Sequence, residues 1–111
     1  MKIEKGMYVR TNKGEILDVF CKTKNYIIAY FKEKPYKVED IIKASYNIID
    51  LIEEGDYVNE YYVYCVINGK IYVDTLDFKV GKNYFEKEDI FTIVTKEQFK
   101  NMEYRIEWNL K

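Results

Sequence analysis

The chain has 111 residues, 48% of them hydrophobic, which suits one ordinary domain or two very small units that share a core. Its 18 Lys and Arg residues nearly balance its 19 Asp and Glu residues, which excludes the acidic excess of a DNA mimic and the basic excess of a typical DNA-binding protein. No apolar run reaches the length of a membrane span and no hydrophobic signal segment opens the chain, so we expect a cytoplasmic protein without a membrane partner.

The first part of the sequence is typical of a β-meander. Apolar and β-branched residues form three runs that are separated by turn residues, and Pro35 then breaks the pattern. A short turn and a closing strand follow at residues 36–44. The three predicted strands are residues 6–11, 15–21 and 26–31, with a turn at residues 12–14 between the first two.

The second part repeats this order. An apolar run at residues 55–67 ends at Asn68-Gly69, which is the strongest short hairpin signal in the chain. A further strand is predicted at residues 70–78, a loop containing Gly81 follows, and residues 88–94 form a closing strand.

The two parts match each other at one constant offset. Gly6, Tyr8 and Val9 recur 49 residues later as Gly55, Tyr57 and Val58, and the E-D-I triplet at 39–41 recurs at 88–90. Two separated blocks with one offset indicate duplicated structural units. We therefore predict an all-β fold of two tandem small β-barrels, residues 1–49 and 50–111, because closing a sheet removes its exposed edges.

A helix is the alternative for residues 38–54 and the prediction for residues 96–102. Apolar residues between 38 and 54 lie close to helical spacing, but their β-branched Ile content and the acidic pair Glu53-Glu54 at the would-be C-terminus favour strands. Thr95 and Gln98 fit a capping box, which predicts a short helix near 96–102 with Phe99 and Met102 facing inward. A final strand is predicted near 103–108.

These motifs also carry a family resemblance. The segments GMYVRTNKGEI, VEDIIKAS, IIDLIEEGDYVN and EDIFTIVTKEQFKNMEY together resemble small, mostly uncharacterised proteins of Firmicutes phages and prophages. The G-x-Y-V entry resembles the first strand of SH3-like barrels, so the resemblance implies two such barrels in tandem. The phage association implies binding to a host protein, such as a CRISPR effector or another defence component. Met7, where the commoner residue is acidic, and NEYYVYCV depart from the family pattern.

The residue types argue against an enzyme. The chain has no histidine and Ser45 is its only serine, so the usual acid-base and hydroxyl-nucleophile groups are missing. The acidic pairs at 39–40 and 88–89 fit turn positions better than catalytic ones. Cys21 and Cys65 lie in apolar strands and are predicted to be buried free thiols, with a disulfide or a metal pair as the alternatives. We predict no cofactor and no metal.

A protein-binding surface is predicted from the tyrosines. In the run at residues 61–67, alternation places Val63, Cys65 and Ile67 on one face and Tyr62, Tyr64 and Val66 on the other. If the second face is not covered by the rest of the fold, Tyr62 and Tyr64 form an amphipathic patch that could anchor a partner or a second copy of the chain. Tyr46 and Trp108 are weaker candidates for the same surface.

Nucleic-acid binding is the alternative. Small barrels bind nucleic acids with lysines on the phosphates and aromatic rings on the bases. The first part of the chain concentrates both residue types, although acidic residues interleave with them and lysines also serve solubility. The candidates are Lys13, Lys22, Lys24, Tyr26, Lys32 and Lys34.

Overall fold

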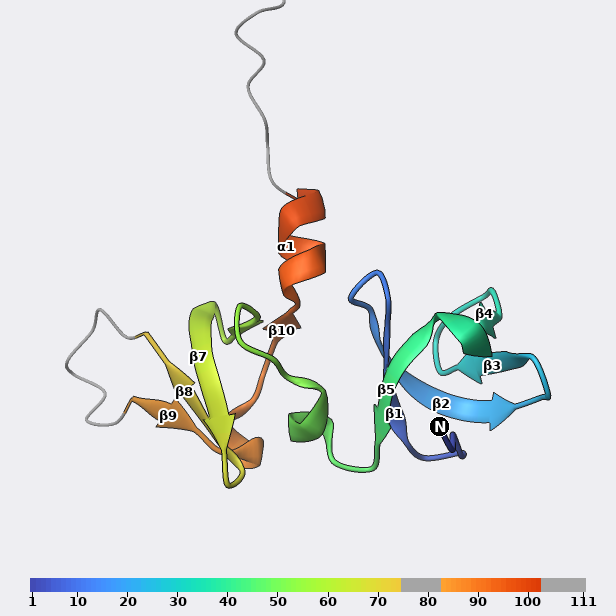
Figure 1. Ribbon diagram of the computed structural model, residues 1–111, viewed down its shortest axis with the longest axis horizontal. Coiled ribbons are helices and arrows are strands. Elements are labelled where there is room, and N and C mark those ends of the chain that lie inside the picture. The colour runs from blue at the N-terminus through green and yellow to red at the C-terminus, as the bar shows by residue number, and fades with distance from the viewer. Residues whose placement is uncertain (75–82, 103–111) are drawn as a thin grey trace, which may run out of the picture.

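The protein folds into two five-stranded antiparallel sheets and one short helix, which confirms the mainly-β prediction and is compatible with two small barrel-like halves. The computed structural model describes residues 1–74 and 83–102. The sheets lie side by side, with the helix α1 rising between them (Figure 1). We call residues 1–47 the first half and residues 48–74 and 83–102 the second half.

The strand order is the same in both halves. The first sheet has the order β4-β3-β2-β1-β5, and the second reads β9-β8-β7-β6-β10. The strands of the first half are β1 (Tyr8–Thr11), β2 (Ile16–Lys22), β3 (Tyr26–Ala29), β4 (Tyr36–Lys37) and β5 (Ile41–Ser45). In the second half they are β6 (Tyr57–Val58), β7 (Tyr61–Ile67), β8 (Lys70–Val73), β9 (Tyr84–Phe85) and β10 (Ile93–Val94).

The backbone hydrogen bonds show where the two copies differ in length. The amide of Gly6 donates to Val19 O at 3.0 Å, and the amide of Gly55 donates to Val63 O at the same distance. Gly6 and Gly55 are 49 residues apart, whereas Val19 and Val63 are 44 apart, so the first half has five more residues between Val9 and Val19 than the second has between Val58 and Val63. The offset returns to 49 at the 3₁₀ turns Val38–Asp40 and Lys87–Asp89.

Residues 38–54 form no α-helix. The chain passes from the first of these 3₁₀ turns into β5 and then into a second 3₁₀ turn, Ile48–Leu51, capped by the side chain of Asn47. Ile41, Ile42 and Ile52 occupy extended backbone, as β-branched residues prefer, whereas Ile48 and Ile49 lie in the second 3₁₀ turn. The strand alternative is confirmed.

A two-residue turn divides the predicted run at residues 55–67. Asn59 and Glu60 both have positive φ, 52° and 73°, as the tight turn between paired antiparallel strands requires. The predicted apolar run therefore holds two strands, because β6 and β7 form a hairpin. The predicted hairpin turn at Asn68-Gly69 is confirmed, with φ values of 51° and 75° between β7 and β8.

The predicted alternation along β7 holds as far as Tyr64. The pairing with β8 shifts between Val63 and Cys65, which marks a β-bulge, and a bulge places two successive side chains on the same side. Val66 therefore packs against the core, while Ile67 is exposed. The same shift occurs in β2 between Val19 and Cys21.

Each half has its own hydrophobic core. The first core consists of Ile3, Val9, Leu17, Val19, Ile27, Ala29 and Ile41. The second consists of Ile49, Ile52, Val58, Val63, Ile71 and Val73. The two cysteines are free thiols, as predicted, but both are only half-buried because they directly follow the bulges.

The predicted C-terminal helix is present as α1 (Lys96–Met102). Its capping box is confirmed: Gln98 N donates to Thr95 Oγ1 at 3.3 Å, and Thr95 N donates to Gln98 Oε1 at 3.1 Å. Phe99 does not face a core as expected, because it is 48% exposed. The Met102 side chain and the final strand expected near 103–108 lie outside the described residues. Among the helices that are described, none has the length and apolar character needed to span a membrane.

Candidate functional site

Four aromatic rings on the second half form a connected group that we call the aromatic row: Phe99, Tyr57, Tyr62 and Tyr64. The ring of Phe99 stacks on Tyr57 with centroids 4.5 Å apart. Tyr57 meets Tyr62 edge to face at 5.7 Å, and Tyr62 meets Tyr64 in the same way at 5.6 Å. Stacked and edge-to-face pairs at these distances are the favourable arrangements of aromatic rings.

The sheet register explains the row. Tyr57 on β6 lies directly opposite Tyr62 on β7, so their side chains project from the same face. Tyr64 is two residues further along β7 and projects from that face as well. Phe99 reaches it from α1. Tyr62 is 37% exposed and Tyr64 52%, so α1 covers the Tyr57 end of this face and leaves the end at Tyr62 and Tyr64 open.

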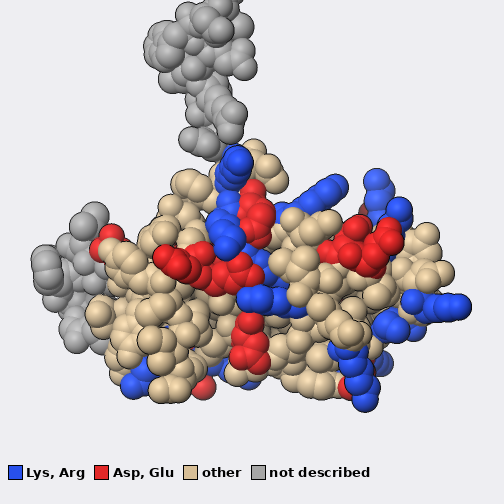
Figure 2. Space-filling model, viewed as in Figure 1, with Lys and Arg blue, Asp and Glu red and all other residues tan. Residues whose placement is uncertain are grey.

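The row combines apolar area with polar groups. A hydrogen bond from the Tyr64 hydroxyl to Asp74 raises the pKa of Tyr64 from its ordinary value, so the hydroxyl stays protonated at neutral pH. Figure 2 shows that the second half presents a largely uncharged surface in the view drawn, whereas charged side chains gather along the middle of the molecule and on the first half. The chemistry of the row suits contact with another molecule better than acid-base catalysis.

The first half carries a second exposed aromatic group, which the sequence reasoning missed. Phe20 meets Tyr30 edge to face at 5.1 Å, and Tyr30 is followed by the fully exposed Phe31. The ammonium of Lys5 lies 5.3 Å from the centre of the Phe20 ring. Phe20 occupies the same place beside a bulge as Tyr64 does in the second half. The match between the triplets V-F-C at 19–21 and V-Y-C at 63–65 is the signal in the sequence that could have identified it.

The remaining predicted partner-binding residues are not brought to the row. Tyr46 is 57% exposed, but its hydroxyl donates to the carboxylate of Glu4, in the N-terminal segment of the first half. This hydrogen bond raises the pKa of Tyr46 and lowers that of Glu4. Trp108 lies outside the described residues.

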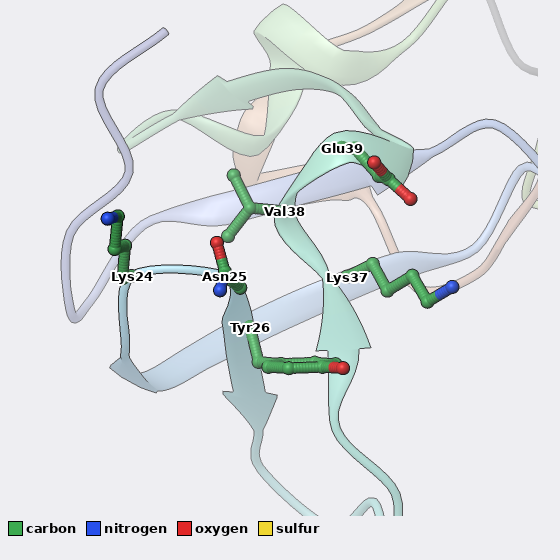
Figure 3. Close-up of a pocket in the computed structure, with 6 residues that line it drawn as sticks. All are labelled: Lys24, Asn25, Tyr26, Lys37, Val38 and Glu39. Carbon is green, nitrogen blue, oxygen red and sulfur yellow. The ribbon is translucent and has the colours of Figure 1, made fainter.

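The predicted nucleic-acid residues lie in three separate places. Lys13 belongs to the turn between β1 and β2, and Lys32 and Lys34 belong to the loop between β3 and β4. Lys22, Lys24 and Tyr26 lie at the turn between β2 and β3. An open pocket of about 470 Å³ lies at this last place, lined by Lys24, Asn25, Tyr26, Lys37, Val38 and Glu39 (Figure 3).

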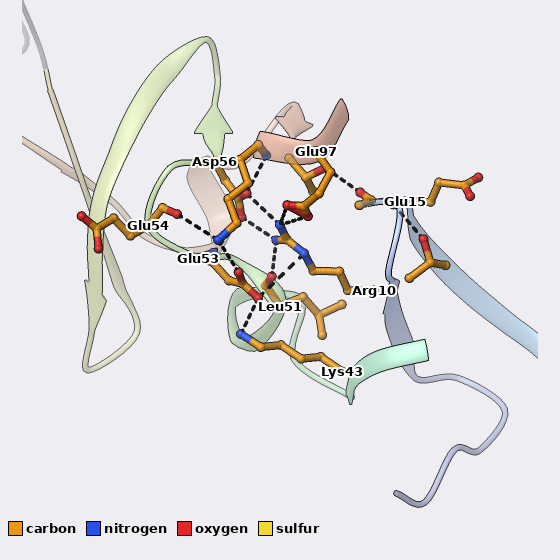
Figure 4. A network of polar contacts seen from close by, with 12 residues as sticks. Arg10, Glu15, Lys43, Leu51, Glu53, Glu54, Asp56 and Glu97 are labelled. Carbon is orange, nitrogen blue, oxygen red and sulfur yellow. Dashed lines mark hydrogen bonds and ion pairs between the residues drawn. The ribbon is translucent and has the colours of Figure 1, made fainter. Parts of the chain in front are cut away.

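An ionic network with a buried centre joins the two halves along a seam (Figure 4), which we define by Arg10, Asp56, Glu53, Glu97, Lys43 and Lys96. The Arg10 guanidinium is fully buried and donates to both carboxylate oxygens of Asp56, at 2.6 and 2.9 Å. It also donates to Glu97 on α1 at 2.7 Å and to the carbonyl of Leu51 at 2.9 Å. Although burial alone would lower the pKa of Arg10, the hydrogen bonds to Asp56 and Glu97 raise it.

Glu53 ties further charges into the seam. Its carboxylate accepts from Lys96 at 2.8 Å and forms an ion pair with Lys43 at 2.9 Å. Burial opposes ionisation of Glu53, but the bonds to Lys96 and Lys43 outweigh it and lower the pKa of Glu53 from 4.5 to about 2. Arg10 Nε has no hydrogen-bond partner among the described residues, and it forms an ion pair with Glu53 Oε2 at 3.9 Å.

The seam depends on residues that differ between equivalent positions of the two copies, and the sequence analysis did not predict it. Met7 and Asp56 occupy equivalent positions 49 apart, and each accepts from the amide three residues before it: Glu4 N donates to Met7 Sδ, and Glu53 N to Asp56 Oδ2. Asp56 has a second oxygen for Arg10. Arg10 is itself equivalent to Asn59, so unequal residues at otherwise repeated positions were the available signal.

Among residues 1–74 and 83–102, no group of three or more Asp, Glu, Cys or His side chains is placed to hold a metal ion. The acidic pairs at 39–40 and 88–89 lie in the two equivalent 3₁₀ turns. The pair Glu53-Glu54 contributes Glu53 to the seam. Comparison with protein-family models, curated proteins and solved structures finds no match to this chain, so a proposal for its function rests on the aromatic row, the pocket and the seam.

Proposed function

We propose that this protein is a non-enzymatic binding protein that blocks a bacterial host protein by stoichiometric contact through the aromatic row. The observation that carries the proposal is a connected set of four rings at the surface of the second half, with Tyr62, Tyr64 and Phe99 each more than a third exposed. The resemblance of its motifs to proteins of Firmicutes phages and prophages implies a host defence component, such as a CRISPR effector, as the class of partner.

Physical reasons favour such a surface for protein contact. Tyr and Phe supply large contact areas while ordering few rotatable bonds, and residues of this kind dominate the energy of many interfaces. In the row each ring is already held by its neighbour, so little side-chain freedom remains to be lost on binding. The hydroxyls of Tyr62 and Tyr64 add hydrogen-bonding groups that fix the orientation of a partner.

The test is capture of partners by the tagged protein from a Firmicutes lysate, with and without nuclease, followed by affinity measurement on the protein identified. We expect the double substitution Tyr62→Ala and Tyr64→Ala to weaken binding by roughly 30-fold or more. Neither side chain belongs to a buried core cluster, so circular dichroism and thermal unfolding should remain close to those of the unchanged protein.

A matched control comes from the first half. Phe20→Ala with Tyr30→Ala removes an exposed edge-to-face pair of similar geometry, 5.1 Å and 79° against 5.6 Å and 76° for Tyr62 and Tyr64. This control should leave affinity unchanged. Loss of binding in the control together with full binding by the tyrosine variant would transfer the contact surface to the first half and overturn the proposal.

Nucleic-acid binding by the first half is the second candidate, and the pocket beside the β2–β3 turn favours it. Lys24 and Lys37 flank the exposed ring of Tyr26 there, which combines phosphate-binding and base-stacking groups. Glu39 lies in the same pocket and opposes the approach of a phosphate. Retention of nucleic acid, or of proteins that disappear after nuclease treatment, would favour this candidate.

A further inference from the structure

We propose that Arg10 of the first half positions Phe99 in the aromatic row of the second half by holding the helix α1, so that the row is complete only while the two halves are locked together. This inference rests on the proposed function, because it concerns the same surface. It assigns Arg10 and Glu97 as positioning residues for partner binding, although neither belongs to the row.

The contacts form a continuous path from the first half to the row. Arg10 donates to both oxygens of Glu97, at 2.7 and 3.1 Å, and Glu97 lies two residues before Phe99 on α1. Phe99 in turn stacks on Tyr57, which meets Tyr62. Each step is a direct contact between side chains or a single turn of helix.

Two more bonds fix the start of α1 to the same seam. The hydroxyl of Thr95 donates to the carbonyl of Gly14 in the first half at 2.7 Å. The amide of Lys96 donates to Asp56, which also binds Arg10. The helix therefore begins on groups that belong to, or are held by, the first half.

The helix needs these contacts because it is short. Seven residues make about two turns, and isolated helices of that length are not stable in water. Its capping box satisfies two amides. The side chains of Glu97 and Thr95 hold it against the first half, and those of Lys96 and Phe99 hold it against Glu53 and Tyr57 of the second half. Loss of the Arg10–Glu97 bond should therefore release Phe99 from Tyr57.

The decisive measurement uses the full-length free protein. Substituting Arg10 would leave Asp56 buried without its partner and could unfold the chain, so Glu97, which is only partly buried, is the better site. We compare Glu97→Gln with Glu88→Gln, which removes the same charge from an exposed 3₁₀ turn of the same half. NMR then follows the ring contact between Tyr57 and Phe99 and hydrogen exchange of the Phe99 amide, which donates to Thr95 O at 2.8 Å.

In Glu97→Gln we expect the Phe99 amide to exchange roughly tenfold faster, because a charge-assisted hydrogen bond is lost. The nuclear Overhauser effect between the Tyr57 and Phe99 rings should weaken in parallel. The Val19 amide, which donates to Met7 O in the first half, should exchange as before, and Glu88→Gln should change neither signal. An unchanged Tyr57–Phe99 contact in Glu97→Gln, or an equal change in Glu88→Gln, would overturn the inference.

This outcome is separable from that of the proposed function, because it needs no partner. If the ring contact weakens but Tyr62→Ala with Tyr64→Ala binds the captured host protein normally, the coupling stands and the proposed function fails. If the tyrosine variant loses binding but the ring contact survives in Glu97→Gln, the proposed function stands and the coupling fails.

Discussion

Arg10 is a fully buried charge that bonds the first half to the second. A guanidinium withdrawn from water loses hydration that only well-placed acceptors can replace, and Arg10 finds them in Asp56, Glu97 and the Leu51 carbonyl. The planar fork of Arg matches the two oxygens of Asp56, which a lysine ammonium could not do. The stability of the seam therefore depends on a pair of charges that are tolerated only together.

We predict that Arg10→Met lowers the free energy of unfolding by about 3–5 kcal/mol, because it leaves Asp56 buried and unpaired. Adding Asp56→Met restores the residue type that Met7 supplies at the equivalent position and should recover part of the loss. Urea unfolding of both single variants and the double variant measures this. If the losses of the two single variants simply add up in the double variant, the two charges do not stabilise each other.

At the scale of elements, the turn between β1 and β2 packs tightly against the start of α1 at Gly14. A Cβ atom added at Gly14 would lie 2.2 Å from Thr95 Oγ1 and 2.7 Å from Glu97 Cβ, and both distances are too short for non-bonded atoms. Gly14 also has φ of +84°, where side chains are strained. The five additional residues of the first copy belong to the segment that brings this glycine against the start of α1.

We predict that Gly14→Ala destabilises the protein by about 2 kcal/mol more than Gly69→Ala does, because overpacking adds to backbone strain. Gly69 is a close control: its φ is +75°, and nothing lies within 4 Å of the Cβ position. Both substitutions thus share the strained backbone and differ in the contact across the seam. Thermal unfolding of both variants is the measurement, and equal losses would show that α1 moves aside without cost.

Sequence patterns predicted local elements better than contacts between distant ones. The Thr95–Gln98 capping box and the Asn68-Gly69 turn were predictable because each depends on residues close in sequence. The bulges were not, since alternation alone cannot show where a strand gains a residue. Tyr62 and Tyr64 were predictable because they lie two residues apart on one strand. Tyr57 and Phe99 join the row through strand pairing and through the placement of α1, which the sequence pattern does not show.

For the whole molecule, the ionised state of Glu53 links the joining of the halves to pH. The folded protein holds the pKa of Glu53 at about 2, below the 4.5 of the unfolded chain, so folding favours the charged form. Its contribution is fully present above pH 4.5 and is lost as pH falls toward 2. Protonation of the Glu53 carboxylate removes both of its ion pairs, with Lys43 and with Lys96.

We predict that the free energy of unfolding falls between pH 4.5 and pH 2, with Glu53 accounting for about 2 kcal/mol of the loss. Glu53→Gln should be less stable at neutral pH and should depend less steeply on pH within this window. Urea unfolding across the pH range measures both effects, with the exposed Glu88→Gln as the reference. A Glu53→Gln curve parallel to that of the unchanged protein would assign the acid sensitivity to other carboxyl groups.

The exchange of residues at repeated positions also makes the joint between the two copies asymmetric. The seam joins Arg10 of one copy to Asp56 of the next, and a third copy would need the same complement at a free end. At one end Met7 stands where the acid would be required. At the other, Asn59 stands in the place of the arginine and is occupied with the backbone of Asp89, Phe91 and Thr92. Among the described residues each copy therefore keeps one side of the joint: the first copy carries the arginine and the second copy carries the aspartate.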